Sequence, residues 1–203
     1  MVVLSDLERV VRALTSGRMV AAGIDIPIGL AARGPRACDQ EARRLLGPRR
    51  SSVFPAPARS VLEAASYEEA CAISRRASGR AISKQLYNIM PKIRELDRLQ
   101  SQPNSRSRRL FEMCPELSFA QLTGAPMRHP KKTPAGRAER MEALRPTFGD
   151  LTSLVEPPPR GATRDDVLDA LVGAWTARRY ASRSSICLGG EMDETGLRMQ
   201  VIA

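Results

Sequence analysis

The chain has 203 residues, 42% of them hydrophobic, a size that suits one well-buried domain over residues 1–203 better than two small ones. Lys and Arg number 32 against 22 acidic residues, which gives a formal charge of +10. Most of the excess is arginine, whose planar guanidinium binds phosphate, so we expect a nucleic-acid partner, the alternative being that the arginine content reflects genome bias alone. No apolar run approaches the roughly 18 to 20 residues needed to span a bilayer, so no membrane insertion is expected.

The composition argues against several other classes of protein. The four cysteines are far apart, without a CxxC pair, and His129 is the single histidine, which argues against a zinc site and a disulfide framework. Arg9, Arg12 and Arg18 interrupt the apolar start of the chain, so we expect no secretory signal and a cytoplasmic location. Aromatic residues make up 4%, too few for rows of rings that stack on single strands.

Helices and strands alternate in the first half of the chain. In order, we expect an amphipathic helix over 4–14, a buried strand within 19–30, a helix over 35–46, a loop over 49–59, a helix capped by Ser66 that ends at Gly79, and a helix over 83–99 kinked or divided by Pro91.

The second half continues the alternation. We expect a flexible connector over 102–108, a strand over 110–114 closed by Pro115, a helix over 133–144, a rigid linker over 156–163, a helix capped by Thr163, and a terminal hairpin. Strands interleaved with helices favour an α/β sandwich over a helical bundle.

Carboxylates stand out in this basic chain. Asp25 lies in an apolar strand, where a charge needs a strand end or a partner, and Asp165, Asp166 and Asp169 share one face of the helix that Thr163 caps. Glu112 and Glu116 lie on either side of the end of the second strand, and their spacing does not say which of them faces inward. Hard oxygen ligands of this kind suit Mg²⁺ or Mn²⁺, and such ions activate water in phosphodiester cleavage, so a nuclease is the first hypothesis.

Each of these residues also has a purely structural interpretation. Acidic residues in a first helical turn complement the helix dipole, which explains Asp165 and Asp166 without a metal, whereas Asp169 lies beyond that turn and is the better candidate ligand. The loop residues Arg49, Arg50, Ser51 and Ser52 form either a phosphate clamp or a solvated basic loop. Lys84 could follow a phosphate backbone, although helix lysines usually face water.

Five segments together resemble one protein family. They are IDIPIGL at 24–30, GPRRSSVFPAP at 47–57, SKQLYNIMPKIRELD at 83–97, EMCPELSF at 112–119 and DDVLDALVGAWTAR at 165–178. In this order they resemble the domain-of-unknown-function 429 family, described as predicted nucleases with an RNase H fold akin to a Holliday junction resolvase.

The resemblance implies an RNase H-like three-layer α/β sandwich with a central mixed sheet. It also implies an acidic cluster at the strand ends that binds two Mg²⁺ or Mn²⁺ ions, with Asp25, Glu116, Asp166 and Asp169 at the acidic positions and Asp25, Glu116 and Asp169 as ligands. Such folds begin with a strand that carries the first acidic ligand, here within a segment resembling DGCxxGW, which this chain lacks. The opening strands are therefore expected to be missing, which would expose a sheet edge that a homodimer could cover.

The leading hypothesis is a metal-dependent nuclease acting on structured nucleic acid, with Arg49, Arg50, Ser51, Ser52 and Lys84 holding phosphates. The alternative is a catalytically inactive nucleic-acid-binding module, which the absent first strand favours. Phosphoryl transfer comes last, because the chain has neither GxGxxG nor GxxxxGK[ST].

Overall fold

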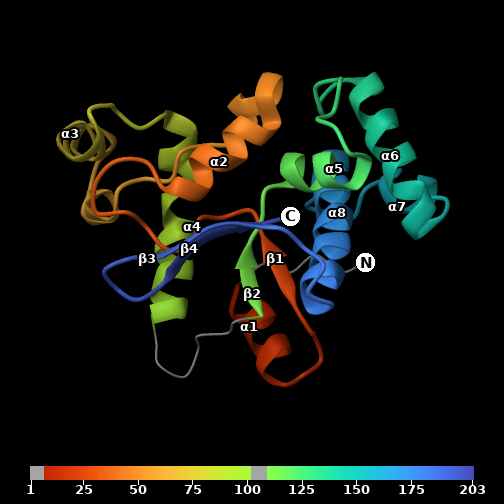
Figure 1. Cartoon of the computed structure of the whole chain (residues 1–203), viewed down its shortest axis with the longest axis horizontal. Helices are drawn as coiled ribbons and strands as arrows, with labels where there is room; N and C mark the ends of the chain where they lie inside the picture. The colour runs from red at the N-terminus through yellow and green to blue at the C-terminus, as the bar shows by residue number, and fades with distance from the viewer. Residues whose placement is uncertain (1–6, 102–108) are drawn as a thin grey trace.

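The computed structural model describes residues 7–101 and 109–203, so the start of the first helix and the connector predicted over 102–108 lie outside the described residues. The fold is mixed α/β. Short strands lie between two groups of helices, one made of α2, α3 and α4 and the other of α5 to α8, while α1 packs near the amino end of the strands (Figure 1). None of the described helices is long and apolar enough to cross a membrane.

The strands form two small paired units. β1 (Ala22–Ile24) runs parallel to β2 (Leu110–Glu112), and β3 (Cys187–Met192) runs antiparallel to β4 (Arg198–Ile202) as the predicted terminal hairpin. A single parallel bridge between Met113 and Ile202 connects the two units. The large central sheet of the expected three-layer sandwich is not seen in the described residues, and this part of the fold prediction is wrong.

The strand predicted within 19–30 is much shorter than expected. After Ile24 the backbone leaves the ladder, because Pro27 has no N–H and Gly29 adopts a φ of +75°. The backbone N–H of Ile28 then donates to Glu112 Oε2 at 2.7 Å, and that of Leu30 donates to Asp193 Oδ2 at 2.9 Å. Side chains therefore take the place of a neighbouring strand over this segment.

The helices of the first half follow the predicted order. They are α1 (Leu7–Thr15), α2 (Ala37–Leu46), the 3₁₀ turns η1 (Gly47–Ser52) and η2 (Arg59–Glu63), α3 (Tyr67–Ser78) and α4 (Lys84–Ser101). Ser66 Oγ accepts from the N–H of Glu69 and Gly79 is left-handed, so both ends of α3 are confirmed. Pro91 lies inside α4 without dividing it, and the predicted loop over 49–59 is partly 3₁₀ helix.

The second half contains two helices that the sequence did not predict, α5 and the short α7. α5 (Pro115–Thr123) starts at the proline that closes β2, a residue suited to a first helical position. α6 (Pro134–Phe148), α7 (Thr152–Val155) and α8 (Arg164–Ala181) follow. Thr163 caps α8, and Asp166 completes a reciprocal capping box with it.

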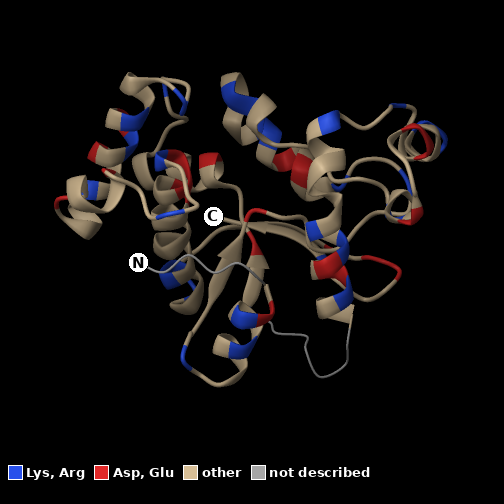
Figure 2. Ribbon diagram, turned by 180° about the vertical axis from the view of Figure 1, so that it is seen from behind, with Lys and Arg blue, Asp and Glu red and all other residues tan. Residues whose placement is uncertain are grey.

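The positive charge is spread over the molecule. Lys and Arg residues lie on helices of both groups and on the loops between them (Figure 2). A distribution of this kind suits contact with an extended polyanion better than a single small anion site.

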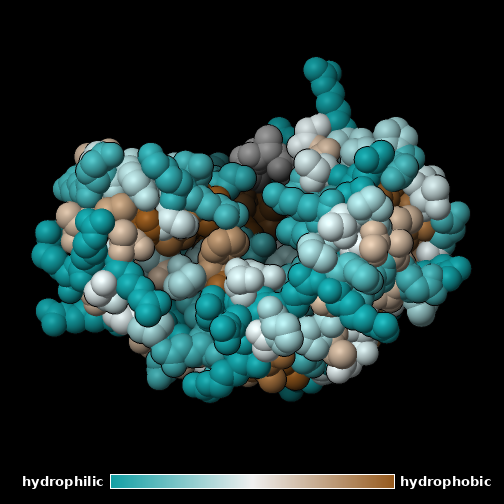
Figure 3. All heavy atoms as spheres, turned by 90° about the horizontal axis from the view of Figure 1, so that it is seen from above, coloured by the Kyte–Doolittle hydropathy of each residue, from teal (hydrophilic) through white to brown (hydrophobic). Residues whose placement is uncertain are grey.

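Each group of helices has its own core. One core contains Phe111, Phe119, Leu144 and Trp175, and the other contains Val61, Met90 and Ile93. Between the two groups the surface is hollowed, with hydrophobic atoms in the depression (Figure 3). The carboxyl ends of β1 and β2 point toward this side of the molecule.

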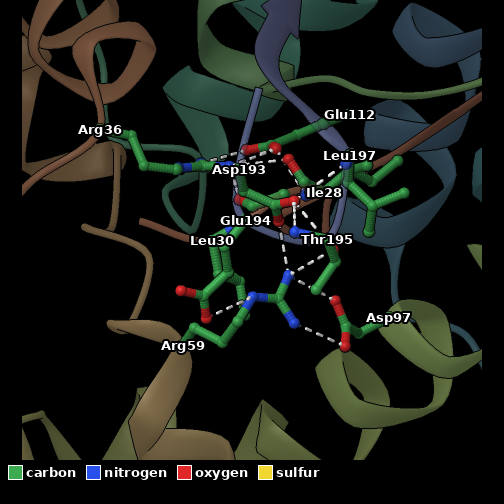
Figure 4. Close-up of polar contacts among 11 residues, drawn as sticks. Ile28, Leu30, Arg36, Arg59, Asp97, Glu112, Asp193, Glu194, Thr195 and Leu197 are labelled. Carbon is green, nitrogen blue, oxygen red and sulfur yellow. Dashed lines mark hydrogen bonds and ion pairs between the residues drawn. The ribbon is translucent and has the colours of Figure 1, made fainter. Parts of the chain in front are cut away.

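Partly buried ion pairs connect the hairpin to the first group of helices (Figure 4). Arg59 NH2 lies 2.5 Å from Asp193 Oδ2 and 3.0 Å from Asp97 Oδ1, so one guanidinium joins η2, α4 and the hairpin turn. Arg36 is bonded to Glu112 and to Asp39, all three buried. These contacts fix β2 and the segment after β1, which carry the candidate site.

Candidate functional site

Three predicted carboxylates come together at the carboxyl ends of the parallel strands. Asp25 directly follows β1, Glu116 lies in the first turn of α5 directly after β2, and Asp169 lies on α8, which packs beside β1. Because β1 and β2 are parallel, their carboxyl ends meet at one edge. The expectation that Asp25 lies at a strand end is thus confirmed.

Asp25 and Asp169 line a groove of about 720 Å³ between β1 and α8. Its walls are mostly apolar and small, with Gly23 on the strand side and Ala170 and Gly173 on the helix side. Asp25 also lines a smaller cavity of about 180 Å³ that reaches Ser52 and Gln85. Asp25 therefore stands where two open spaces meet.

Asp25 is exposed to solvent, and its carboxyl group has a raised pKa. The pKa of Asp25 is raised from 3.8 to about 6, first by loss of hydration and then by the negative charge of Asp169. The positive charge of Lys131 lowers this pKa but does not cancel the increase. No hydrogen-bond donor reaches this carboxylate within the described residues. A carboxylate that lies near another negative charge and accepts no hydrogen bond favours the approach of a cation.

Lys131 is a site residue that the sequence did not reveal. Its Nζ lies 2.9 Å from Asp169 Oδ2, and both side chains are partly buried. Burial alone would lower the pKa of Lys131, but the charges of Asp169, Asp25 and Glu116 outweigh it and raise that pKa. Burial raises the pKa of Asp169 in spite of the bonded lysine. Lys131 is thus the cation near all three carboxylates.

Glu116 is held by a second cation, Arg140. Arg140 NH2 lies 2.5 Å from Glu116 Oε1, and the arginine is 1% exposed while Glu116 is 8% exposed. The other carboxylate oxygen, Oε2, is buried and has no hydrogen-bond partner. An unsatisfied buried carboxylate oxygen is costly in free energy unless something else binds it.

The loop that carries Lys131 is fastened from several sides. Arg49 Nε donates to the carbonyl of Met127 at 2.8 Å and its NH2 donates to the carbonyl of Arg128. Glu139 accepts from the N–H groups of Arg128 and His129, and Arg140 NH1 donates to the carbonyl of His129 at 3.2 Å. Lys131 is therefore presented to Asp169 by an ordered loop.

The remaining predicted residues do not join this cluster. The Arg49 guanidinium bonds to the loop backbone, which leaves less of it for phosphate, while Arg50 and Ser51 are exposed in η1. Lys84 is exposed, with Nζ 4.3 Å from the centre of the Tyr67 ring. Asp166 accepts from the N–H and the hydroxyl of Thr163, so it serves the cap of α8.

Carboxylate oxygens are the kind of ligand that Mg²⁺ and Mn²⁺ prefer. In the part of the chain that the structure describes, Glu116 Oε2 has no hydrogen-bond partner. Asp169 is already paired with Lys131. Over residues 7–101 and 109–203, no three His, Cys, Asp or Glu side chains are gathered as a site for a metal ion.

Comparison with known proteins gives one match. No curated protein and no solved structure is similar enough to match this chain. A family model described as "Protein of unknown function (DUF429)" matches residues 2–194. The match covers nearly the whole sequence and includes every residue of the candidate site, so this chain belongs to the DUF429 family.

Proposed function

We propose that this protein is a nuclease that hydrolyses phosphodiester bonds in structured nucleic acid with the help of Mg²⁺ or Mn²⁺. The observation that carries the proposal is the convergence of Asp25, Glu116 and Asp169, from three separate segments, around the Lys131 ammonium group. The RNase H-like fold suggested by the sequence motifs is part of this proposal.

Asp25, Glu116 and Asp169 would supply the carboxylate ligands, and Glu116 Oε2 has no hydrogen-bond partner among the described residues. A bound divalent ion lowers the pKa of water and stabilises charge on phosphoryl oxygens. Arg140 fixes Glu116 by bonding its other oxygen, and Asp169 orients Lys131. The small residues Ala170 and Gly173 leave room in the groove for a phosphate next to the carboxylates.

The nucleic-acid substrate is supported by charge. The formal charge of +10 and its spread over both groups of helices would attract a phosphate backbone through counterion release (Figure 2). Arg50, Ser51 and Ser52 are placed in η1, and Ser52 lines the smaller cavity together with Asp25. Phosphates held there would lie next to the acidic site.

The test is cleavage of labelled duplex, single-stranded, hybrid and branched substrates in Mn²⁺ or in chelator. The parent is compared with Asp169→Asn and with Asp165→Asn, a control on the same helix outside the cluster. We expect chelator-sensitive cleavage that Asp169→Asn abolishes and Asp165→Asn keeps. Equal cleavage by all three proteins would assign the activity to a contaminant and reject the proposed site.

A second candidate is a catalytically inactive nucleic-acid-binding module. The observation that favours it is that Asp169 and Glu116 are each already bonded to a cationic side chain. Binding that weakens steeply with salt and is indifferent to Mn²⁺ would support this module, whereas Mn²⁺-dependent binding would argue against it.

A homodimer and a cytoplasmic location stay predictions of the sequence. Among the described strands β1 pairs only with β2, and unpaired strand edges are where a second chain can add. Light scattering of the purified protein over a concentration series measures whether this edge leads to association.

A further inference from the structure

An aromatic ring is exposed where two cavities meet beside the first group of helices. Phe54 is 46% exposed, and it is the only exposed aromatic residue in the part of the chain that the structure describes. It lines the smaller cavity of about 180 Å³ that reaches Asp25, and also a cavity of about 540 Å³ (the Arg80 cavity). Pro55 and Leu86 line both cavities as well, so the two spaces adjoin at the Phe54 ring.

The segment that presents this ring is held in place on both sides of it. Before the ring, Arg43 NH1 donates to the carbonyl of Val53 at 2.7 Å. After the ring, the N–H of Ala56 donates to Asp39 Oδ2 at 3.1 Å. Pro55, between these two anchors, has a fixed φ. A ring on a backbone of this kind loses little conformational freedom when another group packs on it.

The Arg80 cavity offers a partner for each part of a nucleotide. The Phe54 ring can stack on the face of a base, and Ser78 and Ser83 line the same space with hydroxyls that can bond to the edge of a base. Arg80 is exposed there, and its carbonyl accepts from Ser74 Oγ at 2.7 Å. Its guanidinium group attracts the phosphate that accompanies every base. This charge, in a chain with a formal charge of +10, favours a nucleotide over an uncharged apolar ligand.

The smaller cavity is less suited to a phosphate. Two of the residues that line it, Asp39 and Glu112, are buried carboxylates that are both bonded to Arg36. The base and its phosphate are therefore expected in the Arg80 cavity. Because the smaller cavity also reaches Asp25, a strand that leaves Phe54 on that side runs toward the acidic residues of the proposed nuclease site.

We propose that the Phe54 ring binds one unpaired base of a nucleic acid in the Arg80 cavity, with Arg80 bonded to the adjacent phosphate. This inference rests on the proposed action on structured nucleic acid, and it names the feature recognised, a nucleotide outside the duplex. Bases inside a duplex are stacked on their neighbours, so only an unpaired or flipped base can present its face to the ring. One ring binds one base, which agrees with an aromatic content of 4%.

The first experiment measures equilibrium binding by fluorescence anisotropy in chelator. The ligands are a blunt duplex, the same duplex with a short thymidine tail, and the same duplex with a tail of abasic nucleotides, which has the phosphates without the bases. The proteins are the parent, Phe54→Ala, Phe54→Trp and Leu45→Ala. Leu45 is the matched control because it is a hydrophobic side chain on α2 with a similar exposure of 49%.

We expect the parent to bind the thymidine tail more tightly than the blunt duplex. Phe54→Ala should bind that tail about tenfold more weakly than the parent, the effect of losing one stacked base, while Phe54→Trp and Leu45→Ala resemble the parent. The abasic tail should weaken binding by the parent to the same extent and binding by Phe54→Ala no further, because the ring and the base form one contact. Losses that add, an equal loss on the blunt duplex, or no preference of the parent for the tail would overturn the inference.

The second experiment measures binding of the tailed duplex over a salt series, with Arg80→Gln and, as a control on α3, the exposed Arg76→Gln. The slope of the logarithm of affinity against the logarithm of salt concentration should fall by about one in Arg80→Gln alone, as for one lost phosphate contact. An unchanged slope would overturn the role of Arg80.

Cleavage of the same tailed duplex in Mn²⁺ separates this inference from the proposed function. If the parent shows base-dependent binding but cleaves no substrate, the nuclease proposal fails and the base site stands. If the parent cleaves the tailed duplex and Phe54→Ala binds and cleaves it equally well, the base site fails and the nuclease proposal stands.

Discussion

Arg36 and Glu112 meet through two parallel hydrogen bonds, with NH1 2.7 Å from Oε2 and NH2 2.6 Å from Oε1. Both residues are buried, and Glu112 Oε2 also accepts from the N–H of Ile28. The pair thus joins α2, β2 and the segment after Asp25. It holds the segment that follows β1 in place through side chains.

Breaking this pair should destabilise the fold strongly. Arg36→Met leaves the Glu112 carboxylate buried without its cation, and losing one partner of such a pair costs about 3–5 kcal/mol. Urea denaturation measures the change in the free energy of unfolding. Arg33→Met, an exposed arginine nearby, is the control and should differ from the parent by less than about 0.5 kcal/mol. Equal effects of the two substitutions would contradict the structural role of the pair.

Asp25 should make stability depend on pH. The folded protein keeps the Asp25 proton to higher pH than the unfolded chain, because its pKa is raised from 3.8 to about 6. This contribution to stability is present below pH 3.8 and is lost as the pH rises through about 6. In chelator, Asp25→Asn should therefore melt higher than the parent near neutral pH and show little gain in acid. A gain of the same size at every pH would contradict the raised pKa.

Gly136 should be required for the order of the Lys131 loop. A Cβ at this position would lie 2.0 Å from the carbonyl oxygen of Pro130, so Gly136→Ala must displace the residue next to Lys131. We expect a loss of about 1–3 kcal/mol in the free energy of unfolding and faster trypsin cleavage after Arg128 and Lys131, read by mass spectrometry. Ala135→Ser, at an exposed neighbouring position, should leave the rate of proteolysis unchanged.

The cap of α8 should be separable from the acidic site. Thr163→Ala removes a hydroxyl that accepts from the N–H of Asp166 and should cost about 1 kcal/mol, and Asp166→Ala should destabilise in the same direction. Neither change touches the carboxylates around Lys131. Thermal melts measure the loss of stability in both variants. Cleavage assays at a temperature well below the melting transition measure whether the acidic site still functions. Loss of cleavage in a folded Asp166→Ala protein would return Asp166 to the site.

One thiol should react much faster than the others. The cysteines are free, and within the described residues only Cys187 is exposed. Burial raises the pKa of Cys38 and of Cys114 to about 12, so these two thiols are both covered and protonated at neutral pH. Intact mass after brief alkylation should show one label per chain, none in Cys187→Ser, and four after the parent is unfolded. Rapid multiple labelling of the native parent would contradict the buried positions.

The features that the sequence predicted are mostly local. The cap at Thr163, the end of α3 at Gly79 and the terminal hairpin depend on neighbouring residues, and all three are confirmed. The position of Asp25 at a strand end followed from the cost of a charge in an apolar strand. Such signals need no knowledge of the tertiary structure.

The features that the sequence did not predict depend on distant contacts. Lys131 meets Asp169 across 38 residues, and in sequence it looks like part of a solvated basic loop. Arg140 reaches Glu116 across 24 residues from another helix. The length of β1 was overestimated because the apolar residues of 26–30 are buried in irregular backbone whose N–H groups bond to distant carboxylates. Periodicity does not distinguish this segment from a strand.

The burial of Arg140 against Glu116 has a consequence for ionic strength. Dissolved salt screens charges at the surface, over about 8–10 Å near physiological concentration, but acts weakly on a pair shielded by protein. Added salt should therefore release a bound polyanion while the inner carboxylates keep their arrangement. The salt concentration can therefore change the affinity for nucleic acid without changing the geometry of the acidic residues. With a short substrate at saturating concentration, the rate of turnover should depend little on salt.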